Sequence, residues 1–379
     1  MPVLVVHNRY RLEGGEERSV QLQVDALRRA GIEHAVLERR SADVSRPRAA
    51  LALLNGGADS DDVHAAVGEL GADVAHVHNM LPLLGPKALD AARDAGAAVV
   101  LQLHNLRLFC AIGVAARDGG PCFRCHHRNT LPGLLLNCRD SVPEAVVYAA
   151  ALARHQPAVI GSVDRFVVPS RYAAGQAALL GVPADRIDVV PHYLPSEAFA
   201  GESRAADGRY ALMAARLSPE KAVDAAIEAA ALVDIPLRVA GEGPERGRLG
   251  EFAELTSAPV EFTGRLHRAG LQAELAGAAM LLMPSRYHEF AGYSALEAMA
   301  AGVPVIASDL GALPELVGEE HCVPPNDPHA LAARMRKLWR DPERRRRQGD
   351  AHIERARAGH SEDRYVGGLR SVYALARAG

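Results

Sequence analysis

Four charged residues in the second half of the sequence have the types and spacing to hold a diphosphate and the hydroxyl groups beside it. Arg216 and Lys221 bracket a tight Ser-Pro turn, and two cations so placed suit a pyrophosphate leaving group. Glu289 and Glu297 are separated by seven residues, the first on a loop and the second in the first turn of a helix predicted over 294–301. The N–H groups at that helix start favour an anion, and the two carboxylates could bind neutral hydroxyl groups, as acidic residues do in Rossmann sites.

Both pairs also have ordinary structural explanations. The two glutamates could be acids that the helix dipole favours, and the two cations could be a surface arginine and a lysine of a capping turn. The occurrence of both pairs in one half of the chain favours the diphosphate site. Because no Asp-x-Asp pair follows a predicted strand, we expect no catalytic metal ion.

A second group suited to chemistry is the pattern C-x11-C-x2-C-x12-C, formed by Cys110, Cys122, Cys125 and Cys138. Four thiolates with a central C-x2-C match a closed tetrahedral Zn²⁺ site, which could fold a loop that has no core of its own. His126 and His127 offer substitute ligands. One or two disulfides, or thiols without a metal, are the alternatives. Cys322 stands apart and is expected to be an ordinary buried residue.

The elements that must position these residues alternate between short apolar strands and Ala/Leu-rich helices, as in βαβ units with a parallel sheet. Strands are predicted in the first half at 3–7, 34–38, 74–78, 98–104, 165–170 and 187–191. After a polar stretch, strands are predicted at 211–215, 237–241, 260–264, 280–284 and 303–308. The fold class is therefore α/β, with two Rossmann-like doubly wound domains. Ligands bind beyond the carboxyl ends of such strands, so we expect the domains to face each other across a cleft that holds the active site.

The predicted domain boundaries follow from these patterns. An N-terminal domain covers 1–194 and includes a cysteine-rich insertion at 107–140, a linker covers 195–208, and a C-terminal domain covers 209–358. A last helix at 361–379 is predicted to return to the N-terminal domain, because it has an apolar side that must be buried. That side is formed by Tyr365, Leu369, Val372, Tyr373 and Leu375.

Several motifs together carry a resemblance to a known family. The second half contains R-L-S-P-E-K at 216–221, G-E-G-P-E at 241–245 and F-T-G-R-L at 262–266, and its E-x7-E segment is followed by EAMAAGVPVIAS and GALPE. This set resembles the donor domain of retaining glycosyltransferases of the GT-B fold, above all the large family 4. The segment HNRYRLEGGEERSV at 7–20 resembles that family's glycine-rich loop on the acceptor side. The resemblance covers nearly the whole chain.

The resemblance implies a role for each matching residue of the donor site. Arg216 and Lys221 would bind the phosphates, Glu289 the hydroxyls of the transferred sugar, and Glu297 the ribose. His104 resembles the histidine that faces the transferred sugar. Together with Arg216, Lys221 and Glu289 it would form the catalytic set. The other donor-binding positions are Gly14, Gly15, Arg265, Leu266, Phe290, Ala291, Gly292, Tyr293 and Ser294.

The acceptor side and the sugar pocket are less closely specified. The residues expected to bind the acceptor are His7, Asn8, His78, Asn105 and Arg107. For His7 and His78, which lie near strand ends, the alternative is an ordinary core or edge histidine. Many relatives place phenylalanine two residues after the first glutamate and directly before glycine, whereas here Phe290 comes one position earlier and Ala291 precedes Gly292. The pocket over the sugar is therefore expected to differ from theirs.

The function implied is a hexosyltransferase or related enzyme that moves a sugar, with retention, from a nucleotide sugar to a hydroxyl of a glycan or small-molecule acceptor. UDP is the expected nucleotide because it is the commonest in the resembled family. In such enzymes the leaving phosphate helps to deprotonate the acceptor, and the protein supplies positioning and electrostatics. The alternatives are a nucleotide-sugar 2-epimerase of the same fold and an inactive zinc-stabilised binding protein. A dehydrogenase is disfavoured because no G-x-G-x-x-G follows the first strand.

Composition excludes some other classes. Apolar residues make up 49% of the 379, which is enough for two cores, and the net charge of −3 with 4% aromatics argues against nucleic-acid binding. The run Arg344 to Arg347 lies among acidic residues and is predicted to be a solvated helix surface. The sequence has no apolar stretch long enough to span a membrane and no charged leader, so a cytoplasmic protein is expected. These features favour no particular oligomeric state.

Overall fold

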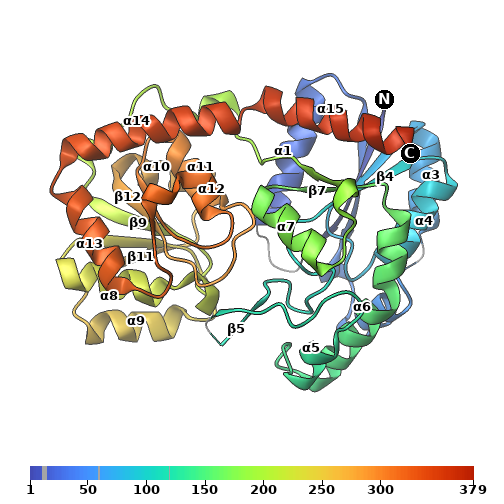
Figure 1. The fold of residues 1–379 in the computed structure, drawn as a ribbon, viewed down its shortest axis with the longest axis horizontal. Helices are drawn as coiled ribbons and strands as arrows, with labels where there is room; N and C mark the ends of the chain where they lie inside the picture. Colours follow the sequence, from blue (N-terminus) through green and yellow to red (C-terminus); the bar gives the residue numbers. More distant parts are fainter. Residues whose placement is uncertain (11–14, 59, 119) are drawn as a thin grey trace. The chain divides into compact units, whose positions relative to one another are not determined.

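Two six-stranded parallel sheets form the framework of the protein (Figure 1). The structure is a computed structural model that describes residues 1–10, 15–58, 60–118 and 120–379. The chain divides into two compact units, of which the first comprises Met1–Ala115, Cys122–His192 and Asp363–Gly379, and the second comprises Ala116–Pro121 and Tyr193–Glu362. The predicted fold class, two Rossmann-like α/β domains, is confirmed in each unit taken by itself.

The sheet of the first unit has the strand order β2-β1-β3-β4-β7-β8. Its strands are β1 (Val3–Arg9), β2 (His34–Arg40), β3 (Val74–Val77), β4 (Ala98–Gln102), β7 (Arg165–Val168) and β8 (Ile187–Val189). Its helices are α1 (Gly15–Arg29), α2 (Arg46–Leu54), α3 (Asp61–Leu70), α4 (Gly85–Asp94), α5 (Leu131–Leu135), α6 (Val142–Ser162), α7 (Arg171–Leu180) and α15 (Glu362–Ala378). The apolar run of β1 is fully buried from Val3 to Val6, as expected for a parallel strand with helices on both faces.

The sheet of the second unit has the order β11-β10-β9-β12-β13-β14. Its strands are β9 (Tyr210–Ala214), β10 (Leu237–Ala240), β11 (Val260–Gly264), β12 (Ala278–Met283), β13 (Val305–Ser308) and β14 (Cys322–Val323). Its helices are α8 (Val223–Val233), α9 (Arg246–Leu255), α10 (Arg268–Gly277), α11 (Tyr293–Ala300), α12 (Leu313–Val317), α13 (Pro328–Trp339) and α14 (Pro342–Gly359). A short antiparallel pair, β5 (Ala116–Arg117) and β6 (Gly120–Pro121), lies within the cysteine-rich segment.

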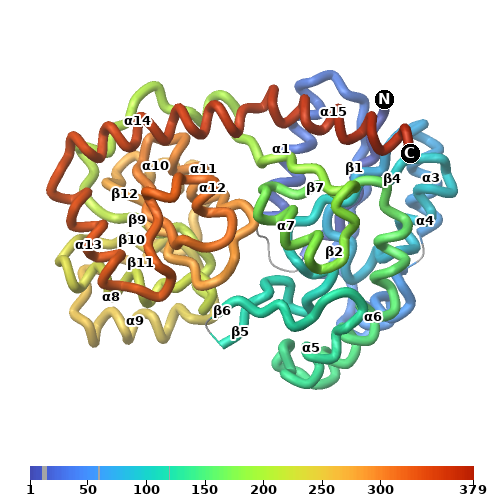
Figure 2. Tube along the Cα trace, viewed as in Figure 1, coloured from blue at the N-terminus to red at the C-terminus, as the bar shows by residue number. Residues whose placement is uncertain are grey.

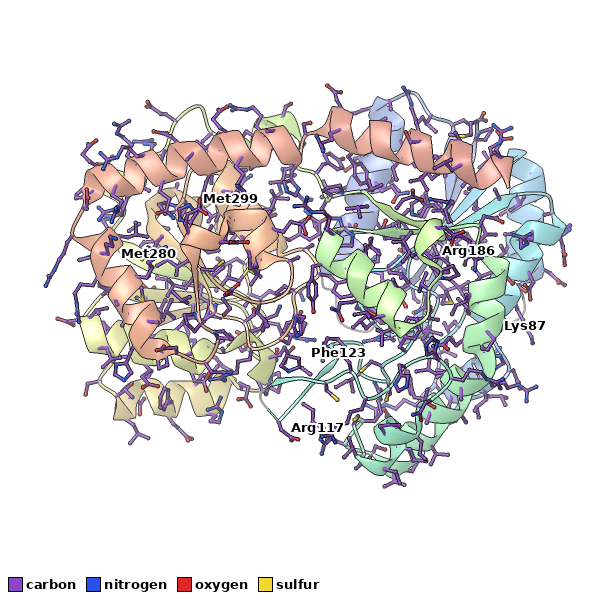
Figure 3. All side chains as sticks on the ribbon, in the orientation of Figure 1. Lys87, Arg117, Phe123, Arg186, Met280 and Met299 are labelled. Carbon is purple, nitrogen blue, oxygen red and sulfur yellow. The ribbon has the colours of Figure 1, made fainter. Side chains whose placement is uncertain are left out.

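Alternation along the strands builds a separate apolar core on each face of the second sheet. In β9, Met213 joins the cluster under α8, α9 and α13, whereas its neighbour Leu212 joins the cluster under α10, α11, α12 and α14. Figure 2 shows these two sets of helices on opposite sides of the strands. Met280 and Met299 lie inside the second unit (Figure 3), one in each cluster. The apolar strands are therefore covered on both faces, and the loops at their ends carry the polar residues.

The last helix, α15, packs within the first unit, beside α1 (Figure 1). Its Tyr373 hydroxyl lies 2.8 Å from His76 Nδ1 and accepts a hydrogen bond of 3.1 Å from Gln23 Nε2. The Tyr365 hydroxyl donates to Gln23 Oε1 at 3.2 Å. The prediction that Leu375 belongs to the buried side is wrong, because that residue lies beyond the edge of the apolar stripe and is 51% exposed.

The arginine run at the start of α14, predicted to be a solvated surface, contains one buried residue. Arg345 is 5% exposed. Its guanidinium donates to the backbone oxygens of Ala205 and Ala206 and of two residues at the end of α13, Leu338 and Trp339. One arginine of the run therefore ties α14 to the segment that enters the second sheet.

Candidate functional site

A buried ion pair joins two of the predicted donor-site residues in the second unit. Lys221 Nζ lies 2.5 Å from Glu289 Oε1, and Glu289 is 6% exposed. The Ser285 hydroxyl donates to the same carboxylate oxygen at 2.8 Å, and the Tyr287 hydroxyl donates to Oε2 at 3.0 Å. Both carboxylate oxygens are thus fixed by hydrogen bonds, which sets the orientation of Glu289.

The electrostatics of this cluster keep the lysine charged. Burial lowers the pKa of Lys221, but the Glu289 carboxylate and the Tyr287 hydroxyl raise it by more, so the net pKa lies above the ordinary value. Burial and the nearby Glu289 charge raise the pKa of Tyr287, so this phenol stays protonated and remains a donor. Lys221 also lies 4.9 Å from the centre of the Tyr287 ring. Sequence reasoning did not identify Tyr287 as a site residue. Its position two residues before Glu289 on the same loop could have indicated it.

Arg216 occupies a different environment from Lys221, although both flank the same turn. Its side chain is 57% exposed and pairs with Glu220 at 2.7 Å, and its Nε donates to the Ser218 hydroxyl at 3.3 Å. The G-E-G-P-E turn packs against this segment so closely that a Cβ on Gly243 would overlap the carbonyl oxygen of Leu217. The two motifs therefore fit together because one of them has glycine at the point of contact.

The start of α11 lies next to the end of β9, just before the segment that carries Arg216. The helix begins at Tyr293 after Gly292, whose φ is +87°. The Ser294 hydroxyl donates to the carbonyl oxygen of Ala214 at 2.8 Å, which joins the helix start to the carboxyl end of β9. Since α11 starts one residue earlier than predicted, Glu297 lies in its second turn and not in its first.

The remaining predicted donor positions are spread over two loops. Phe290 is buried, and Ala291 is half-buried. Arg265 is exposed and Leu266 half-buried in the loop after β11, the edge strand of the sheet. Their predicted contact with the base remains a prediction.

The G-A-L-P-E segment contacts the backbone of the loop that carries Glu289. Ala312 N–H donates to the carbonyl oxygen of Glu289 at 2.8 Å. Gly311 has a φ of +67°, and a Cβ there would lie 2.6 Å from both the nitrogen and the oxygen of Glu289. Because only glycine fits this approach, the resembled motif has a physical role here: it holds the backbone of the glutamate in place.

A row of histidines crosses the interior of the first unit. His78 Nδ1 lies 2.9 Å from His104 Nε2. The rings of His76 and His78 stack at 4.8 Å, those of His78 and His104 at 5.1 Å, and those of His104 and His192 at 6.1 Å. Burial, and then the neighbouring histidines, hold the pKa values of His78 and His104 well below the ordinary value. These rings are therefore neutral near pH 7 and act as hydrogen-bonding groups.

Several predicted acceptor residues line one pocket of the first unit. This pocket is lined by His78, His104, Asn105 and Arg107, together with Glu16. His104 lies just beyond β4, which ends at Gln102 and is two residues shorter than predicted. Sequence reasoning missed Glu16, which reads as an ordinary first-turn acid of α1.

The two predicted acceptor residues on β1 do not belong to that pocket lining. His7 and Asn8 are 1% and 0% exposed, and the Asn8 amide donates to the Ser41 hydroxyl at 3.0 Å. Asn8 thus has a structural bond between β1 and the end of β2. Gly14 lies outside the described residues, and Gly15 begins α1.

The four cysteines of the insertion are half-buried thiols. Burial raises the pKa of Cys125 to about 11, and the three other thiols act on it in the same direction, while the N–H of Gly133 lowers it. Across the described ranges, no three histidine, cysteine or acidic side chains are arranged as metal ligands. Zinc binding thus stays a prediction.

Comparison with known proteins adds independent findings. The family described as "Glycosyltransferase Family 4" matches residues 13–195, and the family described as "Glycosyl transferases group 1" matches residues 196–355. A GDP-mannose-dependent phosphatidylinositol dimannoside mannosyltransferase of Mycobacterium tuberculosis is 39% identical over 140 residues, or 35% of this chain and 36% of that protein. A 2-deoxystreptamine glucosyltransferase of Streptomyces kanamyceticus is 32% identical over 53% of this chain and 62% of its own length. The chain thus spans only about a third of the first of these relatives.

Solved structures resemble the protein over nearly its full length. Sucrose-phosphate synthase from Thermosynechococcus elongatus has a TM-score of 0.74 at 19% identity, with 100% of this chain and 99% of that chain covered. Anabaena HepE in complex with UDP has a TM-score of 0.67 at 15% identity, with 99% and 100% covered. These likenesses confirm the GT-B fold. A search of the described residues found no helix with the length and apolarity to cross a membrane.

Proposed function

The chain belongs to family 4 of the glycosyltransferases, and from this premise we propose that it moves a sugar from a nucleotide sugar to a hydroxyl of a glycan or small-molecule acceptor, with retention. The observation that carries the proposal is the buried Lys221–Glu289 pair, held by Ser285 and Tyr287 at the carboxyl ends of the second sheet. A lysine that keeps its charge beside a fixed carboxylate suits a ligand with both phosphates and hydroxyls. Such a ligand is a nucleotide sugar.

Each residue then has a defined part in the transfer. The Lys221 ammonium and the exposed Arg216 guanidinium stabilise the negative charge that develops on the nucleoside diphosphate as its bond to the anomeric carbon breaks. Glu289 accepts hydrogen bonds from the sugar hydroxyls and Glu297 from the ribose. The acceptor oxygen bonds to the anomeric carbon, and its proton passes to the leaving phosphate. No step requires a metal ion, so activity should persist in EDTA.

Two donor nucleotides are worth testing first. UDP follows from the family resemblance, and GDP is supported by the GDP-mannose-dependent relative that matches over 140 residues. Calorimetric titration with UDP, GDP, dTDP and ADP identifies the base, and a hydrolysis screen of the matching nucleotide sugars identifies the donor. An epimerase would instead interconvert the donor with no acceptor present, and an inactive binding protein would bind nucleotide without turnover.

The lysine offers a sharp test with a matched control. Lys221→Ala should lower kcat/KM for the donor by about 10²-fold, because it removes a charge-assisted contact of about 2–3 kcal/mol. Lys337, an exposed lysine of α13 in the same unit, provides the control Lys337→Ala, which should retain full activity. Equal kinetics in the two variants would remove Lys221 from the donor site.

We also propose that the four cysteines bind one structural Zn²⁺. The chemistry of the donor set supports this, since the four cysteines are half-buried thiols of one segment, and four thiolates are a ligand set for a closed tetrahedral zinc site. Thiols available to a metal suit a reducing compartment, and we propose the cytoplasm. Metal analysis of protein purified under reducing conditions without chelator should find about one zinc per chain, and a zinc-free protein would refute the proposal.

A further inference from the structure

Glu16 connects the start of α1 with the segment that follows β4. One of its carboxylate oxygens, Oε1, accepts a hydrogen bond from the Asn105 side-chain amide. The Asn105 side-chain oxygen accepts in turn from the backbone N–H of Arg107 at 2.8 Å. The Arg107 guanidinium lies 4.5 Å from the centre of the Tyr10 ring. A carboxylate and a guanidinium are thus held at fixed positions within one small cluster.

Two polar atoms of this cluster are buried with unmet hydrogen-bonding capacity. Glu16 Oε2 and Arg107 Nε have no hydrogen-bond partner among the residues that the structure describes. A buried polar atom without a partner costs about 1–3 kcal/mol, so such atoms are uncommon unless a ligand completes them. Both residues line the pocket that is also lined by His78 and His104, so a ligand in that pocket could satisfy both atoms.

The charges of the pocket restrict the chemistry of that ligand. An anion would be attracted by Arg107 but repelled by Glu16, and a cation would meet the opposite combination. A neutral ligand with two adjacent hydroxyls suits both groups, because a hydroxyl can donate to the carboxylate and accept from the guanidinium N–H. The neighbouring His104 is a neutral ring and adds no charge that would change this preference.

We propose that Glu16 and Arg107 form an acceptor subsite that binds a vicinal diol of an uncharged polyol, such as a sugar ring or a cyclitol. One hydroxyl donates to Glu16 Oε2, and the same or the adjacent hydroxyl accepts from Arg107 Nε. Glu16 is an acceptor-binding residue and takes no proton in the reaction. The assignment of this subsite to an acceptor rests on the proposed function, whereas the residues that form it all lie in the first unit.

The electrostatics of Glu16 give this subsite a measurable signature. Burial raises the pKa of Glu16 to about 7, and Arg107 acts in the opposite direction. The charge of Glu17, on the same helix, raises this pKa further, whereas hydrogen bonds from Asn105 and from Tyr10, the residue after β1, lower it. The ionised carboxylate is the better acceptor of a hydroxyl hydrogen bond, so diol binding should strengthen as the pH rises through about 7.

A binding experiment without turnover tests the subsite directly. Saturation-transfer-difference NMR is run on the whole protein with methyl α-glucoside, methyl α-mannoside and myo-inositol as neutral probes, and with glucose 6-phosphate and glucosamine as charged ones. We expect binding of at least one neutral probe, at least tenfold weaker binding of the charged ones, and at least a tenfold loss of affinity in Glu16→Gln. Glu16→Asp should retain the rise with pH, and Glu354→Gln, at a carboxylate 72% exposed in the second unit, should bind like the wild type.

The outcomes separate this inference from the proposed function. Wild-type and Glu16→Gln proteins that bind the neutral probes equally, preference for a charged probe, or no binding of any neutral probe would each overturn the subsite. Failure of the proposed function shows itself elsewhere, as absence of nucleotide binding in calorimetry. Once the donor is known, Glu16→Gln should raise KM for the acceptor at least tenfold and leave KM for the donor unchanged.

Discussion

Replacement of Glu16 by glutamine should change the pH dependence of stability in a way that needs no substrate. Burial raises the pKa of this carboxyl to about 7 from an ordinary value of 4.5, so the folded protein favours the neutral acid. The stabilising contribution of the neutral acid is therefore complete below about pH 4.5 and is lost as the pH rises through 7. Glutamine resembles the neutral acid at every pH, so the variant should not show this loss.

The magnitude follows from the shift. A rise of the pKa from 4.5 to about 7, at about 1.4 kcal/mol for a tenfold change in proton affinity, corresponds to about 3–4 kcal/mol. Between pH 5 and pH 8 the wild type should lose about 2–3 kcal/mol of unfolding free energy relative to Glu16→Gln. The variant should therefore be more stable at pH 8, even though it lacks a charged group that faces Arg107.

Denaturant unfolding at pH 5 and pH 8 measures this difference. Because the single tryptophan, Trp339, lies in the second unit, its fluorescence does not report on the first unit, which is followed instead by hydrogen exchange of the α1 amides. The exposed Glu354→Gln is the control and should change with pH in parallel with the wild type. A Glu16→Gln protein that does the same would refute the assigned burial of the carboxylate.

Three further substitutions test other contacts. Gly311→Ala places a Cβ 2.6 Å from the backbone of Glu289, and calorimetry should show at least tenfold weaker binding of the nucleotide sugar. The control Gly359→Ala, whose Cβ meets no atom within 4 Å in the described structure, should bind the nucleotide sugar like the wild type. Arg345→Met leaves four backbone oxygens without this donor and should lower the unfolding free energy by about 3 kcal/mol, compared with little change for Arg346→Met, whose side chain is 49% exposed. Tyr373→Phe removes the hydroxyl that contacts Gln23 and His76 and should cost about 1 kcal/mol, visible as faster hydrogen exchange in α1. Leu375→Ala, on the exposed side of α15, should leave that exchange unchanged.

The fold could be predicted because both sheets are buried on two faces. Parallel strands in that environment are nearly continuous apolar runs, and runs such as Val3 to Val6 are easily distinguished from the helical segments. Prediction was weakest at the ends of elements. The strand before His104 ends at Gln102, and α11 begins at Tyr293, since the last turn or pair of an element depends on its neighbours and not on its own pattern.

The site residues divide according to whether their partners are near in sequence. Glu289 could be identified from its spacing to Glu297, but its bond to Lys221 joins residues 68 apart and depends on the sheet topology. Glu16 was missed because an acid in a first helical turn has an ordinary explanation, and its partner Asn105 lies 89 residues away. Arg345 was predicted to be solvated because an arginine in a charged run usually is, and only the packing shows that this one is buried.

The position of α15 has a consequence for how the protein is made. The bond between Tyr373 and His76 joins residues 297 apart, and nearly all of the second unit is encoded between them. During synthesis, α1 and β3 leave the ribosome long before the helix that covers them exists. Domains usually fold in the order in which they emerge, but here the later unit has most of its sequence in one stretch and can complete its core first. Until α15 emerges, the surface that it covers in the earlier unit stays exposed, and exposed apolar surface makes a partly made chain prone to aggregation.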